Sequence, residues 1–207
     1  GVGPLSAATQ PQQTAPAAKP RQLNLETKPW KGDFDQMLER RLIRVLVPYS
    51  RSLYFVDKGR ERGVTAELMR DFEAHLNKKY AKQLGKRPLT VIMIVTTRDK
   101  LLSGVAEGMG DIAAGNLTAT EERRKIVDFI APTDRKPVQE LIVTGPASPQ
   151  IAALDELSGK TIHLRKATSY YESVLALNQR LKKAGKAPAK IVELLPALED
   201  EDILEML

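Results

Sequence analysis

The sequence predicts an α/β fold in which the strands of a parallel sheet alternate with helices. Short apolar or β-branched runs alternate with segments of helical periodicity from residue 30 to the end. Of the 207 residues, 42% are hydrophobic and 28% are charged, which is the balance of a globular domain. No apolar run approaches the roughly 20 residues that a membrane-spanning helix needs. These observations exclude a collagen, a fully disordered chain and a disulfide mini-protein.

Residues 1–29 differ from the rest in composition. They hold five of the 13 prolines, four glutamines and five alanines, with no aromatic residue. Such a stretch buries too little apolar surface to offset the entropy of ordering it, so we expect a flexible tether. A tether to a membrane anchor and a plain ragged terminus both fit this composition. Because the chain starts at Gly1 without a leader pattern, any export signal is expected to have been removed.

The first half of the folded region is expected to contain three helices and three strands. The helices are placed at 33–41, from residue 64 onward and at 99–107, and the strands at 43–47, 89–95 and 111–114. The long helix is expected to bury a stripe at i+4 spacing, formed by Val64, Leu68, Phe72, Leu76 and Tyr80, with Met69 beside it. Strand 89–95 is almost entirely apolar, which predicts that both of its faces are covered.

The second half continues the alternation. Strands are expected at 138–143, 161–164 and 191–194, and helices at 151–157, at 169–183 and from residue 198. The last helix places Ile203, Leu204 and Leu207 on an apolar face and reaches the end of the sequence without a capping residue. We therefore expect the natural chain to continue beyond Leu207.

The stretch from Gly104 to Phe129 holds the densest set of candidate functional residues. A short strand ends at Ala114, Gly115–Asn116 turns the chain, and Thr118 and Thr120 precede the charged turn Glu121–Arg124. The carboxyl edge of a parallel sheet is where open α/β folds bind ligands, and helix N-termini favour anions. Arg123 is placed to clamp a carboxylate with two hydrogen bonds. A helix cap followed by a solvated run of charges explains the same residues without a ligand.

This stretch resembles the signature of the family 3 extracellular solute-binding proteins. The matching residues are Gly108, Asp111, Gly115, Thr118, Thr120, Arg123 and Val127-Asp128-Phe129, with Asn116-Leu117 as the local variant. Other segments agree in order: 43–47 resembles the first strand of the family, 63–68 the start of its first helix and 154–160 the beginning of its second lobe. The likeness covers about Arg40 to Leu207.

The resemblance implies a type II periplasmic-binding-protein-like fold, with two lobes that close on a small ligand. Lobe 1 is expected at 30–143, and the hinge with a truncated lobe 2 at 144–207. The implied ligand-binding residues are Arg123, Thr118, Gly115, Asn116, Thr168, Ser169, Tyr54 and Phe55. Arg123 grips the ligand carboxylate, and the two aromatic residues either stack on the ligand or pack in the lobe. The acidic residue that takes a ligand ammonium is expected beyond Leu207, so the ligand class stays open.

Within the family, residues 33–45 and 53–56 resemble the N-terminal regulatory module of membrane-bound lytic transglycosylase F. The resemblance implies a periplasmic sensing module, with an anchor at the outer membrane as an option supplied by an element outside this chain, and with peptidoglycan as a partner of the parent protein. The catalytic Glu-Ser pair of that parent is expected outside this chain, so the module binds an amino acid or a cell-wall peptide and does not cut. A free-standing amino-acid receptor of an ABC transporter is the alternative.

Other classes of function find little support in the residues. With two distant histidines, His75 and His163, and no cysteine, neither a catalytic triad nor a metal or cofactor site is expected; His75 is expected in solvent and His163 packed in its strand. Two basic clusters stand out, at 78–87 and 180–190. Both fall at helix ends, where cations complement the helix dipole, and a contact with anionic cell wall or lipid is the functional alternative. Without aromatic residues interleaved to stack bases, no nucleic acid is expected as a partner.

Overall fold

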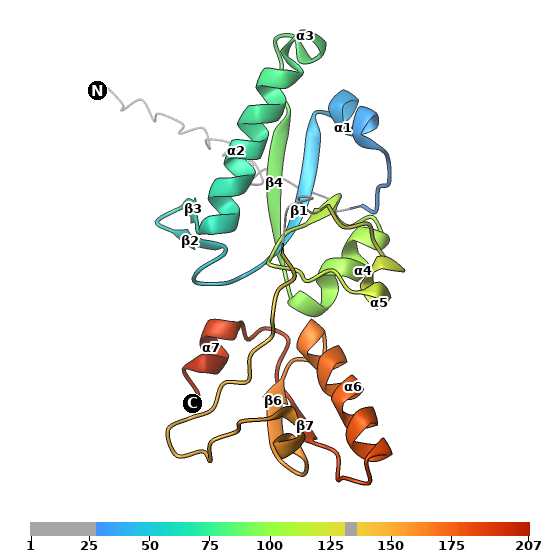
Figure 1. Ribbon diagram of the computed structural model, residues 1–207. Helices are drawn as coiled ribbons and strands as arrows, with labels where there is room; N and C mark the ends of the chain where they lie inside the picture. The colour runs from blue at the N-terminus through green and yellow to red at the C-terminus, as the bar shows by residue number, and fades with distance from the viewer. Residues whose placement is uncertain (1–27, 131–135) are drawn as a thin grey trace, which may run out of the picture.

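A parallel three-stranded sheet in the order β4–β1–β5 forms the centre of the first of two lobes (Figure 1). Its strands are β1 (Leu42–Pro48), β4 (Thr90–Thr96) and β5 (Ile112–Ala113). β1 pairs with β4 along its whole length and with β5 at its middle residues, Val45 and Leu46. The computed structural model describes residues 28–130 and 136–207, and lobe 1 here means the part built around this sheet.

Helices cover the sheet of lobe 1, and a short hairpin extends from it. The elements are α1 (Phe34–Arg40), α2 (Val64–Lys79), α3 (Ala81–Leu84), the 3-10 helix η1 (Arg98–Lys100), α4 (Leu101–Ala106), α5 (Glu121–Arg124) and the hairpin of β2 (Phe55–Asp57) with β3 (Arg60–Arg62). The main core lies between β1, β4 and α2, where Val45 and Val47 are fully buried. All of the helices and strands expected in this half form, with small shifts at their ends.

The buried face of α2 differs from the predicted stripe. Val64 is 66% exposed and Leu68 is 58% exposed, whereas Ala66, Met69 and Leu76 are buried. The buried face of the helix begins at Thr65 and Ala66, and Phe72 and Tyr80 pack against the same core. The later part of the predicted stripe is therefore confirmed, and its start at Val64 and Leu68 is wrong. Steps of four residues drift around a helix of 3.6 residues per turn, so a long i+4 series does not stay on one face.

Strand β4 was expected to be covered on both faces, and this is wrong within the described residues. β4 is the edge strand of the order β4–β1–β5, and Val95 is 49% exposed. β1 takes the central place instead, with Ile43 through Pro48 all buried. Both strands read as apolar runs, so composition did not distinguish the centre of the sheet from its edge.

Lobe 2 is built around a second, smaller parallel sheet (Figure 1). Its elements are the 3-10 helix η2 (Leu154–Leu157), β6 (Thr161–Leu164), α6 (Ser169–Lys183), β7 (Lys190–Glu193) and α7 (Asp200–Leu204). The bounds of β6 and α6 agree with the prediction residue for residue. α6 packs Leu177 and Leu181 on Leu157, and Val174 on Leu164.

The strand expected at 138–143 does not form. These residues have no regular structure, and Leu141 is 80% exposed. A strand needs a hydrogen-bonded partner, and the described sheet of lobe 2 pairs only β6 with β7. His163 was expected to pack in its strand and is instead exposed, since β6 turns Ile162 and Leu164 toward α6.

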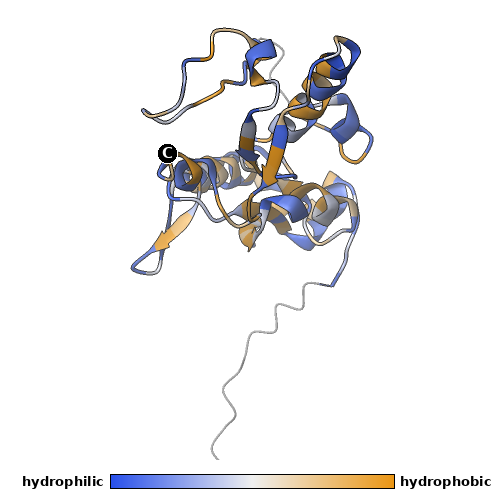
Figure 2. Cartoon of the chain, turned by 90° about the horizontal axis from the view of Figure 1, so that it is seen from below, coloured by the Kyte–Doolittle hydropathy of each residue, from blue (hydrophilic) through white to orange (hydrophobic). Residues whose placement is uncertain are grey.

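The hydropathy of the chain follows this architecture. In Figure 2 the hydrophobic colour gathers in the strands at the centre, and the helices carry hydrophobic and hydrophilic sides. Among the described residues, no helix combines the length and apolar composition needed to cross a bilayer. The tether expected at 1–29 lies almost wholly outside the described residues, and the lobe boundary at 143/144 stays a prediction.

Candidate functional site

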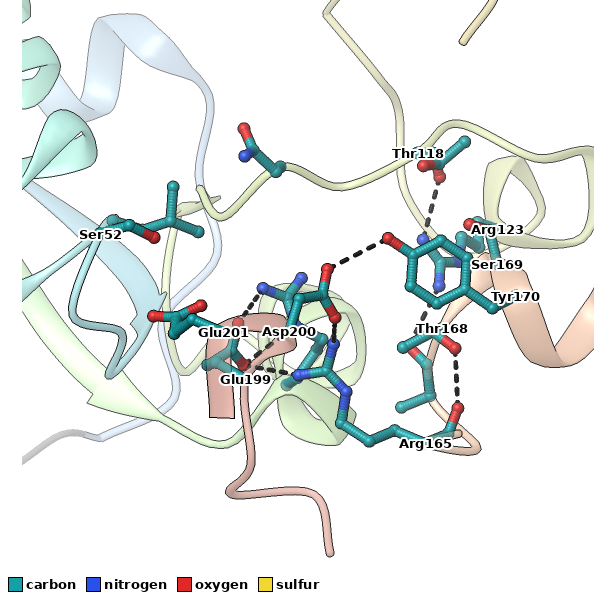
Figure 3. Close-up of a pocket in the computed structure, with 14 residues that line it drawn as sticks. Ser52, Thr118, Arg123, Arg165, Thr168, Ser169, Tyr170, Glu199, Asp200 and Glu201 are labelled. Carbon is teal, nitrogen blue, oxygen red and sulfur yellow. Dashed lines mark hydrogen bonds and ion pairs between the residues drawn. The ribbon is translucent and has the colours of Figure 1, made fainter. Parts of the chain in front are cut away.

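A cavity of about 270 Å³ lies between the two lobes (Figure 3). Lobe 1 contributes Ser52, Leu53, Arg98, Asn116, Thr118 and Arg123. Lobe 2 contributes Arg165, Ala167, Thr168, Ser169, Tyr170, Glu199, Asp200 and Glu201. The lining is mostly polar and charged, so the cavity suits a small, polar ligand.

The topology explains why these residues meet. The loops that follow β1, β4 and β5 all leave the same edge of lobe 1, because carboxyl ends of parallel strands share one edge of a sheet. The loop after β6 and the start of α6 face this edge from lobe 2 (Figure 1). Segments far apart in the sequence thus surround one cavity.

Arg123 connects the two lobes across this cavity. Its side chain is only 9% exposed; Nη1 donates to the carbonyl of Thr118 (3.0 Å) and Nη2 to the carbonyl of Ala167 in lobe 2 (3.0 Å). Nε lies 3.3 Å from the Glu172 carboxylate. A guanidinium has five N–H donors, so these three contacts leave one N–H on each terminal nitrogen. A carboxylate ligand can be held by such a pair of donors.

The N-terminus of α6 faces the cavity from lobe 2. Thr168 is its N-cap residue, but the hydroxyl donates to the carbonyl of Arg165 (2.7 Å) and caps no backbone N–H. The first turn of a helix leaves N–H groups without intrahelical partners, and its dipole favours a negative group there. Thr168 and Ser169 are both buried. This end of the cavity therefore complements an anion.

A buried ion network crosses the cavity floor. Glu199 is 3% exposed and lies between Arg98 of lobe 1 and Arg165 of lobe 2. Arg98 donates through Nε (3.1 Å) and Nη2 (2.5 Å), and Arg165 Nη1 lies 3.0 Å from the same carboxylate. Arg98 also donates to the carbonyl of Gly115 (2.8 Å), so the network positions the turn that follows β5.

The start of α7 adds two more carboxylates to the wall. Asp200 pairs with Arg165 and accepts a hydrogen bond from the hydroxyl of Tyr170 (3.1 Å). Burial, followed by this carboxylate, raises the pKa of Tyr170. Glu201 accepts a hydrogen bond from Ser50 Oγ of lobe 1 (2.7 Å). Burial alone would raise the pKa of Glu201, but this hydrogen bond and those from backbone N–H groups together lower it.

The structure brings together five of the eight predicted site residues: Asn116, Thr118, Arg123, Thr168 and Ser169 line the cavity. Gly115 is not among the lining residues, and its carbonyl accepts a hydrogen bond from Arg98, which is.

Tyr54 and Phe55 are not among the residues that line the cavity. Tyr54 is 4% exposed within the core of lobe 1, and its hydroxyl donates to Glu61 (3.0 Å). Burial and this hydrogen bond raise the pKa of Tyr54 to about 12. Phe55 begins strand β2. Of the two alternatives for Tyr54, the contacts therefore favour packing within the lobe over stacking on a ligand.

Sequence reasoning missed the charged residues on the cavity floor, Arg98, Arg165 and Glu199. A signal was present for the arginines. Arg165 directly follows the apolar strand β6, and Arg98 is separated from the end of β4 by one residue, Thr97. Charged residues at the carboxyl ends of parallel strands are candidates for a ligand site. Within residues 28–130 and 136–207, no group of three or more histidine, cysteine or acidic side chains gathers as a metal site.

One sequence expectation needs correction. A Glu-Ser pair does occur on a helix of this chain, at Glu172–Ser173 in α6. Glu172 lies on Arg123 as an ion pair. Because its carboxylate lies 3.3 Å from Arg123 Nε of lobe 1, this residue contributes to the contact between the lobes.

Comparison with solved structures supports the two-lobe fold. An amino acid ABC transporter substrate-binding protein, AbpA, from Streptococcus pneumoniae bound to L-arginine superimposes with a TM-score of 0.56 at 19% identity, over 83% of this chain and 65% of that chain. The ancestral amino acid-binding protein AncCDT-1, a precursor of cyclohexadienyl dehydratase, gives a TM-score of 0.53 at 23% identity, over 83% of this chain and 67% of that one. At these identities the likeness concerns the fold, which is that of type II periplasmic binding proteins.

Sequence comparison identifies a relative and a family. Membrane-bound lytic murein transglycosylase F from Desulfosudis oleivorans is 31% identical over 108 residues, which are 51% of this chain and 22% of the relative. The chain thus spans less than a quarter of that protein. The model of the bacterial extracellular solute-binding proteins, family 3, matches residues 45–193. This match covers both sheets and most of the cavity lining, and the chain belongs to the family 3 bacterial extracellular solute-binding proteins.

Proposed function

We propose that this chain is the ligand-binding module of a periplasmic lytic murein transglycosylase, and that its lobes close on a small carboxylate-bearing ligand. An amino acid or a cell-wall peptide is the ligand class that fits. The observation that carries the proposal is Arg123, which lies in the inter-lobe cavity with contacts to both lobes and one N–H free on each terminal nitrogen. Four other proposed ligand-binding residues, Asn116, Thr118, Thr168 and Ser169, line the same cavity.

The chemistry of the cavity favours a ligand with two ends of opposite charge. Arg123 and the N-terminus of α6 form a positive end. The Asp200 side chain, about half exposed, contributes a negative charge to the wall beside them. A zwitterionic amino acid or a short peptide places its carboxylate at the positive end, beside Arg123, and its ammonium toward the carboxylate of Asp200. Of the remaining proposed residues, Gly115 acts through the turn that Arg98 holds and Tyr54 through the core of lobe 1.

Binding on this basis includes lobe closure. The contact from Arg123 to Ala167 and its pair with Glu172 already span the lobes, so a ligand carboxylate that joins Arg123 adds a third component to a contact between lobes. A ligand that binds the closed form better than the open form shifts the population toward closure. This is the property that a sensing module needs.

The test is calorimetric titration of the chain with a panel of amino acids and cell-wall peptides. Arg123→Ala is expected to weaken binding by at least about tenfold, since a hydrogen bond between charged groups contributes about 1.5–3 kcal/mol. Arg124→Ala is the matched control: Arg124 is the next residue of α5, is exposed, and lies over the ring of Phe129. Unchanged affinity in Arg123→Ala would reject the proposed site.

The second candidate is a free-standing receptor that delivers an amino acid to an ABC transporter. The fold of AbpA, a transporter substrate-binding protein, favours it. The gene sequence around this chain separates the two proposals. A catalytic domain encoded in the same reading frame supports the sensing module, and a gene that encodes a solute-binding protein alone supports the receptor.

A further inference from the structure

The end of lobe 1 that carries α3 is rich in basic residues that the ligand site does not use. Residues 78–87 hold five basic and no acidic residues, namely Lys78, Lys79, Lys82, Lys86 and Arg87. All five are exposed. We call this group the basic pole. It forms one end of the molecule, and lobe 2 forms the other (Figure 1).

The helix dipole explains only part of the basic pole. Lys78 and Lys79 fall in the last turn of α2, where cations are stabilised, and Lys82 lies in the short α3. Lys86 and Arg87 follow the helices and complement neither end. Acidic residues of α1 lie at the same end, but residues 33–41 hold three acidic and two basic residues, so the pole keeps its positive charge.

The basic cluster of lobe 2 provides a contrast. Three of its cations, Arg180, Lys182 and Lys183, lie in the last turn of the long helix α6. Asp155 pairs with Lys186 (2.9 Å) and lies 3.8 Å from Arg180. The helix end and one carboxylate thus explain most of this cluster. At the basic pole, no ion pair is recorded for the five cations among the described residues.

Apolar surface accompanies the cations at the basic pole. Phe34 is 36% exposed and packs edge-on against Tyr80, with the ring centroids 5.2 Å apart. Lys79 Nζ lies 5.4 Å from the centroid of the Tyr80 ring. Arg41 donates to the carbonyls of Leu84 and Arg87 and so ties the loop after α3 to the end of α1. Tyr80 is half-buried, so Phe34 is the exposed ring of this pair. An exposed apolar ring among lysines is typical of surfaces that lie in the headgroup region of a bilayer.

We propose that the basic pole is a docking surface for a bilayer that carries anionic phospholipids. The lysines and arginine bind the headgroups, and Phe34 enters the boundary between headgroups and acyl chains. The cavity between the lobes lies away from this end, so docking leaves the ligand site accessible. Sequence analysis left a contact with anionic cell wall or lipid as the alternative for both basic clusters, and the structure favours the cluster on lobe 1 and a lipid surface.

The test measures sedimentation of the 207-residue chain with vesicles of phosphatidylcholine, with and without phosphatidylglycerol. The variant Lys78→Glu/Lys82→Glu/Lys86→Glu is expected to bind the anionic vesicles at least about a hundredfold more weakly, since each basic residue near the surface contributes about fivefold. The matched control is Lys182→Glu/Lys183→Glu/Lys190→Glu, which changes the net charge equally at exposed positions of lobe 2. The control is expected to stay within a few-fold of the original chain.

Three outcomes would overturn the proposal. Equal weakening by both triple variants would assign the binding to net charge rather than to this surface. Binding to phosphatidylcholine alone, undiminished in either variant, would assign it to another part of the chain. Equally tight binding to soluble heparin, with Phe34→Ala without effect on vesicle binding, would assign the surface to an anionic polymer. The proposal expects Phe34→Ala to weaken vesicle binding by a few-fold and to leave heparin binding unchanged.

Discussion

Two buried networks of arginine and carboxylate hold this molecule together, one within lobe 1 and one between the lobes. In lobe 1, the Asp111 carboxylate accepts three hydrogen bonds from Arg44, donated by Nη2 (2.8 Å), Nε (3.2 Å) and the backbone N–H (2.7 Å). It accepts a fourth from Arg40 Nη2 (3.1 Å). Between the lobes, the Glu199 carboxylate accepts hydrogen bonds from Arg98 and Arg165. The carboxylates are equally hidden from solvent, but the chain around them differs.

The side chains of the network in lobe 1 also form hydrogen bonds with backbone groups of lobe 1. Arg44 lies on β1, Asp111 directly precedes β5, and Arg44 also donates to the carbonyls of Trp30 (3.1 Å) and Gly108 (2.9 Å). The network between the lobes depends on side chains that the two lobes bring separately. The first therefore belongs to the folding of a lobe, and the second is able to break while both lobes stay folded.

The largest expected effect comes from Asp111→Ala. The change leaves Arg44 buried without its carboxylate, and removing one partner of a buried pair costs about 3–5 kcal/mol. We expect the free energy of unfolding, measured with urea, to fall by that amount. Asp99→Ala removes an exposed carboxylate of η1 and is expected to stay within about 0.5 kcal/mol. A loss below about 1 kcal/mol for Asp111→Ala would show that the two networks are not distinguished by their role in folding.

Glu199→Gln is expected to have a smaller and more local effect. An amide keeps the shape of the side chain but leaves Arg98 and Arg165 close together without a shared negative charge, at a cost of about 2 kcal/mol. Amide hydrogen exchange is the measurement, because it separates local from global opening. Exchange is expected to rise in α7 and in the loops after β4 and β6, and to stay unchanged in β1. Faster exchange throughout β1 and β4 would contradict the distinction.

The same comparison shows what the sequence was able to predict. β6 and α6 were found at their observed residues because alternation and helical periodicity are local signals. The parallel α/β class and the turn around Gly115–Asn116 were predicted from signals that are equally local in the sequence. Asn116 adopts a positive φ of 52°, as a residue in such a turn does. Arg123, which a local motif marked as a candidate, lies in the lining of the cavity, and its role in ligand binding stays a prediction.

Long-range pairings were not predictable in this way. Arg98 and Glu199 are 101 residues apart, and nothing near either residue indicates the other. The strand expected at 138–143 failed for a related reason, since an apolar run becomes a strand only when another strand pairs with it. The residues that sequence reasoning missed therefore belong to the contact between the lobes, and the candidates that do line the cavity come from local motifs of single segments.

The smallest expected effect concerns Glu201, another carboxylate between the lobes. Hydrogen bonds from Ser50 and from backbone N–H groups lower its pKa below the ordinary value of 4.5. A carboxyl with a lowered folded-state pKa stabilises the fold above its unfolded pKa, and this contribution is lost as the pH falls through the folded-state value. The midpoint of thermal unfolding of the original chain is therefore expected to exceed that of Glu201→Gln above about pH 4.5.

The difference between the two midpoints is expected to shrink as the solution is acidified and to vanish once Glu201 is protonated in both states. Its size corresponds to about 1 kcal/mol, the contribution of one hydrogen bond. Ser50→Ala removes the donor and is expected to reduce the same pH dependence, because the Ser50 hydroxyl lies 2.7 Å from the carboxylate. A difference that persists unchanged into acid would mean that the contact acts through packing and not through charge.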